Sequence, residues 1–231
     1  MKSFPNIPKT ELYLVGGCVR DHLLSVSVKD RDFVAITKLS FVDFVSEIMK
    51  IGEVFMVKKE FLTVRCKIDN EVIDIAYPRV ESDYNDGRHP SKVSSTQSLK
   101  EDASRRDFTI NAMFMDKYGN ILDFFKGQND LKRGTIKTVR NPDLRFQEDY
   151  LRILRAVRFS VKLKFRIDIK TWDAMVSNAY KLDGISSERI KDELNASLRY
   201  NQWETIENIE ELGIKDLLNL KGLRFELTSK Q

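Results

Sequence analysis

Short apolar runs separated by polar turns dominate the first half of the chain, a pattern typical of a β-sheet. Asp69 and Asn70 lie between the last two runs and predict a hairpin turn. Between the second and third runs, apolar residues at helical spacing predict a helix over 40–50, with Ser40 as its N-cap. A shorter helix is expected between the first two runs. The predicted strands span residues 11–15, 33–36, 53–57, 62–68 and 71–77.

Helical periodicity replaces this pattern from about residue 145 onward. Within 147–161 the apolar side chains recur at helical spacing, and 202–231 predicts one further helical hairpin. Between the two halves, residues 81–103 hold few large apolar side chains and many Ser, Asp and Lys. Because such a stretch has little to bury, we expect a mobile loop there.

Length and composition indicate the size of the domains and the compartment in which the protein is expected. The chain has 231 residues, 42% hydrophobic and 32% charged, which suits a soluble globular protein with one large or two modest domains. The net charge of +4 and the pI of about 8.9 are compatible with nucleic acid without requiring it. The N-terminus lacks the apolar core of a signal peptide, and no run approaches membrane-spanning length. We therefore expect a cytoplasmic protein with no membrane partner.

The scarcity of cysteine and histidine leaves little material for several classes of site. Cys18 and Cys66 are isolated and match neither a zinc spacing nor a disulfide framework. His22 and His89 are the two histidines, so a Ser-His-Asp triad or a histidine metal site has little support.

Two aspartates and a Gly-Gly turn lie close together in residues 14–33. Asp30 and Asp32 are two apart, so in an extended segment they share a face and present four carboxylate oxygens. Such oxygens suit Mg²⁺, which takes few protein ligands and is shared with substrate phosphates. Gly16 and Gly17 let backbone approach a bound group, and the helix N-terminus beside them favours an anion. Alone, each pair is more often a solvated strand edge or a plain turn, but together they indicate a nucleotidyl-transfer site.

Asp74 lies inside the otherwise apolar strand predicted over 71–77. A carboxylate in a buried strand is costly unless it is paired or binds a metal. The alternative is an edge position that faces water. Given Asp30 and Asp32, we favour Asp74 as a third carboxylate from a neighbouring strand.

A second cluster of charged residues precedes a strand-like run near residue 110. Arg105 and Arg106 suit the oxygens of a triphosphate in both geometry and charge. Asp107 or Asn111 could accept from or donate to ribose hydroxyls. Taken alone, an ordinary surface charge cluster is the more common explanation.

Asp149 and Arg152 are three apart in a predicted helix and are therefore expected to be neighbours on one face. A surface ion pair without function is the simple explanation. Cytosine and adenine, however, both present an amino donor beside a ring-nitrogen acceptor. An Asp that accepts from the amine and an Arg that donates to the ring nitrogen would complement both bases and oppose guanine and uracil.

Taken together, these motifs resemble those of the class II tRNA nucleotidyltransferase and bacterial poly(A) polymerase family. The DGRHPSKVSSTQSLKEDASRRD segment is also similar to the family's flexible loop, and KDRDF resembles the CCA-adding members more than the poly(A) polymerases. In order, the motifs are LVGGCVRDHLL with KDRD, RRDFTINAM, DFFKGQNDL, EDYLRILRAVRF and SERIKDEL, and they span residues 11–194.

The resemblance implies an α+β fold with two parts. Residues 1–138 would form a polymerase β-like nucleotidyltransferase head, a mixed sheet with helices that carries catalysis. Residues 139–231 would form an all-helical neck that recognises the nucleotide base and includes a remnant of the body. The implied reaction is template-independent addition of CMP or AMP from CTP and ATP to the 3′ end of tRNA, with release of pyrophosphate and two Mg²⁺ ions as cofactors.

The resemblance also assigns roles to individual residues. Arg155 and Arg158 would stiffen the base-reading helix or touch phosphate, and the SERIKDEL segment would brace that helix. The metal ligands would be Asp30 and Asp32. The catalytic residues would be Asp30, Asp32 and Asp74. The nucleotide-binding residues would be Gly16, Gly17, Arg20, Arg106, Asp107, Asn111, Asp149, Arg152, Arg155 and Arg158.

Departures from the family pattern leave alternatives open. Ser25 and Lys126 stand where family members usually carry Gly. The family's body and tail, which grip the tRNA, have no counterpart here, so we expect a truncated form with head and neck only. Three alternatives stay open: a compact variant that binds only the acceptor end of the tRNA, self-association or a partner that replaces the missing parts, or a chain that is cut short. Addition of A only, of CC only or of poly(A) stays open, as does an RNA-binding module that has lost catalysis.

Overall fold

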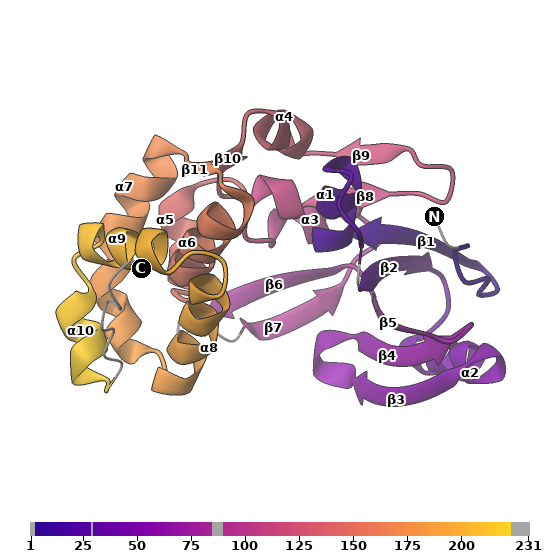
Figure 1. The fold of residues 1–231 in the computed structure, drawn as a ribbon. Coiled ribbons are helices and arrows are strands. Elements are labelled where there is room, and N and C mark those ends of the chain that lie inside the picture. Colours follow the sequence, from indigo (N-terminus) through magenta and orange to yellow (C-terminus); the bar gives the residue numbers. More distant parts are fainter. Residues whose placement is uncertain (1–2, 29, 85–89, 223–231) are drawn as a thin grey trace. The chain divides into compact units, whose positions relative to one another are not determined.

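A computed structural model describes residues 3–28, 30–84 and 90–222 of the chain. The chain divides into two compact units (Figure 1). Unit 1 comprises residues 1–83 and 91–128, and unit 2 comprises 84–90 and 129–231. The main division therefore falls after residue 128, somewhat before the boundary expected at 138. No helix in the described ranges is long and apolar enough to cross a bilayer.

Unit 1 is built on a mixed sheet of seven strands in the order β3-β4-β5-β2-β1-β8-β9. Strands β2 and β5 run parallel, and the other neighbouring pairs are antiparallel. All five predicted strands are therefore confirmed. The strands are β1 (Thr10–Val15), β2 (Arg31–Thr37), β3 (Glu53–Lys58), β4 (Thr63–Ile68), β5 (Glu71–Ala76), β8 (Met113–Met115) and β9 (Ile121–Asp123).

Helices and turns of unit 1 follow the local signals in the sequence. Helix α1 (Gly17–Leu23) contacts β1, β2 and β8, and α2 (Phe41–Ile51) contacts β3 and β4. The Ser40 hydroxyl accepts a hydrogen bond from the Asp43 amide at 3.1 Å, which confirms the predicted cap. The hairpin between β4 and β5 is also confirmed, with both turn residues at positive φ, as the favoured two-residue turns require.

The core of unit 1 lies where these helices cover the sheet. Phe44 and Ile48 of α2 are fully buried, as is Val19 of α1. Phe33 and Ile75 are buried as well, from the two parallel strands. This apolar packing fixes β2 and β5, so polar side chains at the ends of these strands are held in place.

The prediction of a mobile loop over 81–103 is wrong for the residues of this segment that the structure describes. Strands β6 (Arg79–Tyr84) and β7 (Pro90–Ser95) form a two-stranded sheet, and α3 (Leu99–Ser104) follows. The segment has few apolar residues because its structure relies on backbone pairing and ion pairs such as Arg79 with Glu81. Residues 85–89 of the predicted loop lie outside the described ranges.

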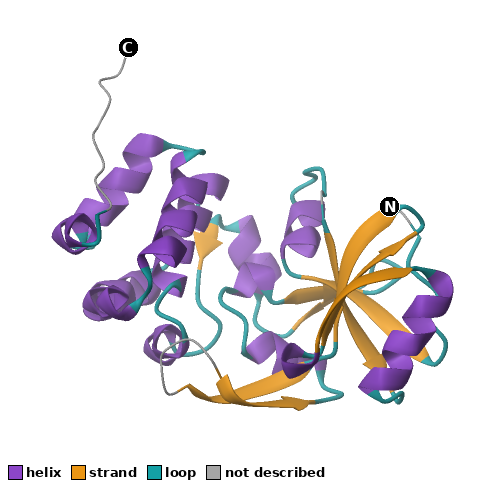
Figure 2. Ribbon diagram, turned by 90° about the horizontal axis from the view of Figure 1, so that it is seen from below, coloured by secondary structure: helices purple, strands orange, loops and turns teal. Residues whose placement is uncertain are grey.

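Unit 2 is mainly helical (Figure 2), as expected, with one exception. Strands β10 (Thr135–Ile136) and β11 (Arg166–Ile167) pair in parallel, and β11 interrupts the neck that was expected to be all helical over 139–231. Strand β10 falls within the short strand that the GTIKTV run predicts over 134–139, whereas β11 was not predicted because two residues are too few for a periodic signal. Within the predicted C-terminal hairpin the structure has two helices, α9 and α10, which hardly contact one another. The helices of unit 2 are α4 (Gly127–Lys132), which begins at the end of unit 1, α5 (Pro142–Glu148), α6 (Arg152–Leu163), α7 (Ile169–Asn178), α8 (Ser187–Leu198), α9 (Gln202–Glu211) and α10 (Lys215–Leu220), with a 3₁₀ helix at Ala179–Gly184. Unit 1 has two further 3₁₀ helices, at Lys59–Phe61 and Thr109–Asn111.

Candidate active site

Two of the predicted carboxylates are neighbours across the parallel strands of unit 1. Asp32 on β2 is directly opposite Asp74 on β5 in the strand register. Residues opposite one another in a sheet point to the same face. Asp30 immediately precedes β2, and its charge acts on Asp32. The sheet therefore gathers negative charge at one end of β2 and β5.

The electrostatics of this end of the sheet favour a bound cation. Although Asp32 reaches solvent, partial burial of its carboxylate and the charges of Asp74 and Asp30 raise its pKa, while Arg106 and Arg65 oppose that rise. Arg65 is itself a weak counterion, because its Nε lies 3.8 Å from an Asp74 oxygen and both side chains are exposed.

A metal at this site would depend on ligands beyond the protein. Within the described ranges, no group of three or more His, Cys, Asp or Glu side chains is arranged to hold a metal. Asp30, Asp32 and Asp74 therefore do not form a closed three-carboxylate cage. Two adjacent carboxylates without soft ligands still fit Mg²⁺, which keeps waters and shares substrate phosphates.

The Gly-Gly turn lies against two arginines. Gly16 has φ of 76°, and a Cβ there would lie 3.4 Å from a guanidinium nitrogen of Arg106. A Cβ on Gly17 would lie 3.4 Å from a guanidinium nitrogen of Arg20. The turn thus needs glycine for its conformation at the first position and brings backbone close to positive charge at both.

Arg20 is held inside unit 1 by a chain of hydrogen bonds. It is only 3% exposed, and its Nη1 donates to the Asn111 side-chain oxygen at 2.7 Å. The Asn111 amide in turn donates to Asp107 at 3.2 Å, and a second guanidinium nitrogen of Arg20 lies 2.6 Å from Asp21. The structure therefore joins three of the predicted nucleotide-binding residues in one network.

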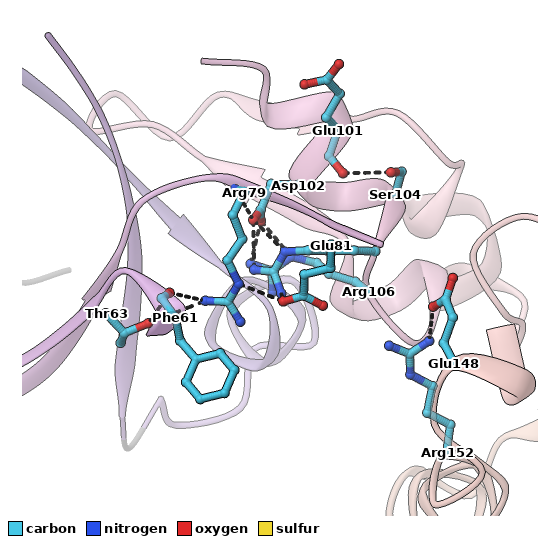
Figure 3. A network of polar contacts seen from close by, with 11 residues as sticks. Phe61, Thr63, Arg79, Glu81, Glu101, Asp102, Ser104, Arg106, Glu148 and Arg152 are labelled. Carbon is cyan, nitrogen blue, oxygen red and sulfur yellow. Dashed lines mark hydrogen bonds and ion pairs between the residues drawn. The ribbon is translucent and has the colours of Figure 1, made fainter. Parts of the chain in front are cut away.

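Arg106 is anchored by a buried carboxylate that sequence reasoning did not single out. Asp102 on α3 is fully buried, and its two oxygens accept from Arg105 at 2.7 Å and from Arg106 at 2.9 Å. Figure 3 shows the Asp102 carboxylate facing the guanidinium of Arg106. Burial alone would raise the pKa of Asp102, but the charges and hydrogen bonds of the two arginines outweigh it and lower the pKa.

In unit 2, Asp149 does not lie on a helix with Arg152, which corrects the prediction. Helix α5 ends at Glu148 and α6 begins at Arg152, so Asp149 occupies the extended residue between them. Its carboxylate accepts from the Leu151 amide at 3.2 Å and lies 3.4 Å from Arg189. The continuous apolar period across the junction concealed the break.

Arg152 is paired with the residue before Asp149. Its Nη1 donates to Glu148 at 2.7 Å and to the Arg145 carbonyl at 2.9 Å, and Figure 3 shows the Glu148 pair. The other Glu148 oxygen accepts from Arg145 at 2.7 Å. Glu148 therefore fixes the orientation of Arg152, a role that its spacing of four residues from Arg152 could have suggested.

The next two arginines of α6 face α8. Arg158 donates to Glu193 at 2.6 Å, Arg155 lies 3.6 Å from the other Glu193 oxygen, and both guanidinium groups stack near Phe159. Glu193 belongs to the SERIKDEL segment, so the described contacts match the bracing role expected of that segment. The two arginines thus link α6 to Glu193 of α8.

Comparison with known proteins relates both units to one group. Residues 12–137 match the poly(A) polymerase head domain family, and 164–219 match a family described as the probable RNA and SrmB-binding site of polymerase A. A CCA-adding enzyme of Lactobacillus helveticus is 43% identical over 183 residues, which cover 79% of this chain and 45% of that protein.

Solved structures give the same relation in three dimensions. The Bacillus stearothermophilus CCA-adding enzyme in complex with CTP aligns with a TM-score of 0.80 and 32% identity, over 90% of this chain and 50% of that one. The Thermotoga maritima CCA-adding enzyme complexed with tRNA_CCA aligns with a TM-score of 0.74 and 29% identity, over 90% and 48%. The chain spans about half the length of these relatives. It belongs to the poly(A) polymerase head domain family.

Proposed function

We propose that this protein adds CMP and AMP from CTP and ATP to the 3′ end of tRNA without a template, releasing pyrophosphate. The observation that carries the proposal is the pairing of Asp32 with Asp74 in the strand register beside the Gly16-Gly17 turn. A carboxylate pair next to an arginine-lined turn suits a nucleoside triphosphate with its metal. The relatives that carry the name CCA-adding enzyme support the choice of RNA 3′ end and nucleotides.

In this proposal the residues of unit 1 hold the triphosphate and the attacking hydroxyl. Asp30 and Asp32 would hold two Mg²⁺ ions, which lower the pKa of the 3′ hydroxyl and stabilise the leaving pyrophosphate when bound. Asp74 orients the hydroxyl or shares a metal. Arg20 and Arg106 contact phosphate oxygens, and their buried partners keep the guanidinium groups in place before substrate arrives.

The ribose contacts would come from the network behind the Gly-Gly turn. Asn111 both accepts from Arg20 and donates to Asp107, so its orientation is fixed. A fixed amide and carboxylate can distinguish ribose hydroxyls by donating to one and accepting from another. We therefore assign Asp107 and Asn111 to ribose recognition.

The base would be read by residues of unit 2. Asp149 accepts from the exocyclic amine of cytosine or adenine, and Arg152 donates to the adjacent ring nitrogen. Glu148 and Arg189 position these two side chains through the ion pairs described above. Because protein groups read the base, no nucleic-acid template is required.

The direct test measures incorporation of labelled CTP and ATP into tRNA by the wild type and by Asp32→Ala. We expect Asp32→Ala to lose incorporation by at least about a thousandfold, with tRNA affinity nearly unchanged, because the metal site and not the RNA grip is removed. Asp173→Asn, an exposed change on α7, is the matched control and should behave as wild type. Persistent incorporation by Asp32→Ala would overturn the metal assignment. A wild type that binds RNA without incorporating nucleotides would instead indicate a binding module.

A further inference from the structure

The surplus positive charge of the chain is concentrated in two short segments of unit 2. Residues 129–140 and 162–170 together contain eight Lys or Arg and two Asp, whereas the whole chain has a net charge of only +4. The remainder of the chain is therefore slightly acidic. The basic pI comes from these segments and not from an evenly basic surface.

The small parallel sheet brings the two segments together. Thr135 on β10 is opposite Arg166 on β11, so the two side chains point to the same face. Arg133 and Lys137 are each two residues from Thr135 and are expected on that face too. All four line a single pocket of about 330 Å³. A feature that the sequence pattern did not predict thus unites distant basic residues.

We define the basic surface as six residues of these segments, all of them exposed: Lys132, Arg133, Lys137, Lys164, Arg166 and Lys170. Within the described ranges none of the six forms an ion pair. Three arginines of α5 and α6 differ from these six residues in having counterions. Arg145, Arg152 and Arg158 are paired with Glu148 or Glu193. Three of the six, Arg133, Lys137 and Arg166, line the pocket, and the other three lie in the same two segments. Exposed cations without protein counterions favour an anionic partner.

Two carboxylates, Asp130 and Asp168, also line the pocket, and both have partners within the protein. Asp168 caps α7, with its Oδ2 accepting from the Thr171 amide at 3.3 Å. Asp130 is buried and hydrogen-bonded or paired within the protein. Both acids therefore have structural partners, and the exposed charge at this surface is positive.

We propose that the basic surface binds the phosphate backbone of the RNA substrate, an inference that rests on the proposed function. No aromatic side chain in 129–140 or 162–170 is exposed, so this surface offers no platform for base stacking. Lys and Arg without aromatic partners suit phosphates, which position RNA without reading its sequence. The RNA-binding family match begins at Lys164, and the small sheet adds Arg133 and Lys137 from outside that match.

The test replaces three residues around the pocket, as Arg133→Gln/Lys137→Gln/Arg166→Gln. A fluorescein-labelled RNA hairpin with a single-stranded 3′ CC end is titrated at several salt concentrations. We expect the affinity to fall at least about tenfold, and the slope of log K against log salt to become less steep by about two to three, because three phosphate contacts are lost. The maximal rate of nucleotide addition at saturating RNA should stay within about twofold.

Two further variants keep the result interpretable. Lys191→Gln/Arg199→Gln/Lys215→Gln removes the same charge from exposed positions on and beside α8 and α10 and should bind RNA as the wild type does. Arg133→Lys/Arg166→Lys keeps the charge and should retain affinity, which separates charge from misfolding.

Three outcomes would overturn the proposal. The first is equal RNA affinity of the Gln triple variant and the wild type. The second is an equal loss of affinity in the α8 and α10 control, which would indicate net charge rather than this surface. The third is tighter binding of the wild type to phosphatidylserine vesicles than to RNA. Surface-dependent RNA binding by a wild type that adds no nucleotide would reject the proposed function and leave this inference standing.

Discussion

At the scale of single residues, most of the proposed site depends on carboxylates whose partners are arginines. Asp102, Glu148 and Glu193 each hold two guanidinium groups, and the arginines they hold include four of the five arginines predicted to bind nucleotide. Such a partner orients the arginine before substrate binds, so less entropy is lost on binding. Glu148 and Glu193 lie inside the EDYLRILRAVRF and SERIKDEL motifs, and Asp102 lies shortly before RRDFTINAM, but the motifs do not reveal that these carboxylates anchor arginines.

Replacing Asp102 tests this arrangement through stability. We expect Asp102→Asn to lower the free energy of unfolding by about 3 kcal/mol at pH 7, because two arginines lose a buried counterion. The pKa of Asp102 is lowered in the folded state, so its stabilisation is present above the unfolded value and lost as pH falls through the folded pKa. Urea unfolding should therefore show the gap between wild type and variant closing in acid. An unchanged gap, or equal loss in the exposed Glu53→Gln control, would contradict this role.

Replacing Asp149 tests base recognition. Asp149→Ala removes the proposed acceptor for the exocyclic amine, so the preference for CTP and ATP over UTP and GTP, measured as ratios of kcat/KM, should fall at least about tenfold. Because Arg189 also loses its partner, Arg189→Gln is the matched variant. We expect it to weaken binding of all four nucleotides similarly. Unchanged selectivity in Asp149→Ala would reject the assignment.

At the scale of elements, the sequence predicted the strands, helices and turns that carry a local signal, such as a hydrophobic period or a turn residue. Five of the seven strands of the main sheet, the Ser40 cap and the 69–70 hairpin followed from periodicity and turn residues. The prediction of a mobile loop over 81–103 was wrong because that segment is held by backbone pairing and ion pairs. The prediction that Asp149 and Arg152 share a helix was wrong because a helix break lies inside a continuous apolar period. The pairing of β10 with β11 depends on tertiary structure, so no local pattern could reveal it.

Two positions where glycine is usual in the family have left-handed backbone in this chain. Ser25 has φ of 57° and Lys126 has φ of 63°. A side chain other than glycine is strained there by about 1 kcal/mol. We expect Ser25→Gly to raise the free energy of unfolding by about 0.5–1 kcal/mol in urea titrations. Ser46→Gly, in the middle of α2, is the control and should lower it by a similar amount. A loss in both variants would contradict the strain argument.

The brace between α6 and α8 makes a separate prediction. Glu193→Gln removes a carboxylate that accepts from Arg158 and lies near Arg155. Because a charge-assisted hydrogen bond contributes about 1.5 kcal/mol or more, amide hydrogen exchange in α6 should become about tenfold faster. Asp192→Asn, exposed on the same helix, should leave the exchange unchanged. Equal exchange in all three proteins would show that the ion pairs do not brace α6.

At the scale of the whole molecule, chemistry and RNA contact are assigned to different parts of the chain. The proposed metal and phosphate residues lie in unit 1, while the proposed base-reading residues and the basic surface lie in unit 2. The metal and phosphate residues and the base-reading residues were predicted, because each group lies within a short sequence motif. The basic surface was not predicted, because its two halves meet only in the folded unit.

The 3′ ends that the protein makes test the central proposal most directly. The protein is incubated with Mg²⁺, CTP and ATP and with tRNAs that end at the discriminator base, at C or at CC, and the product ends are then sequenced. Our account predicts that every tRNA is extended to CCA and no further, with no product from Asp32→Ala. Extension by A alone, by CC alone or by long runs of A would contradict CCA addition, and no extension of any tRNA would contradict nucleotidyl transfer altogether.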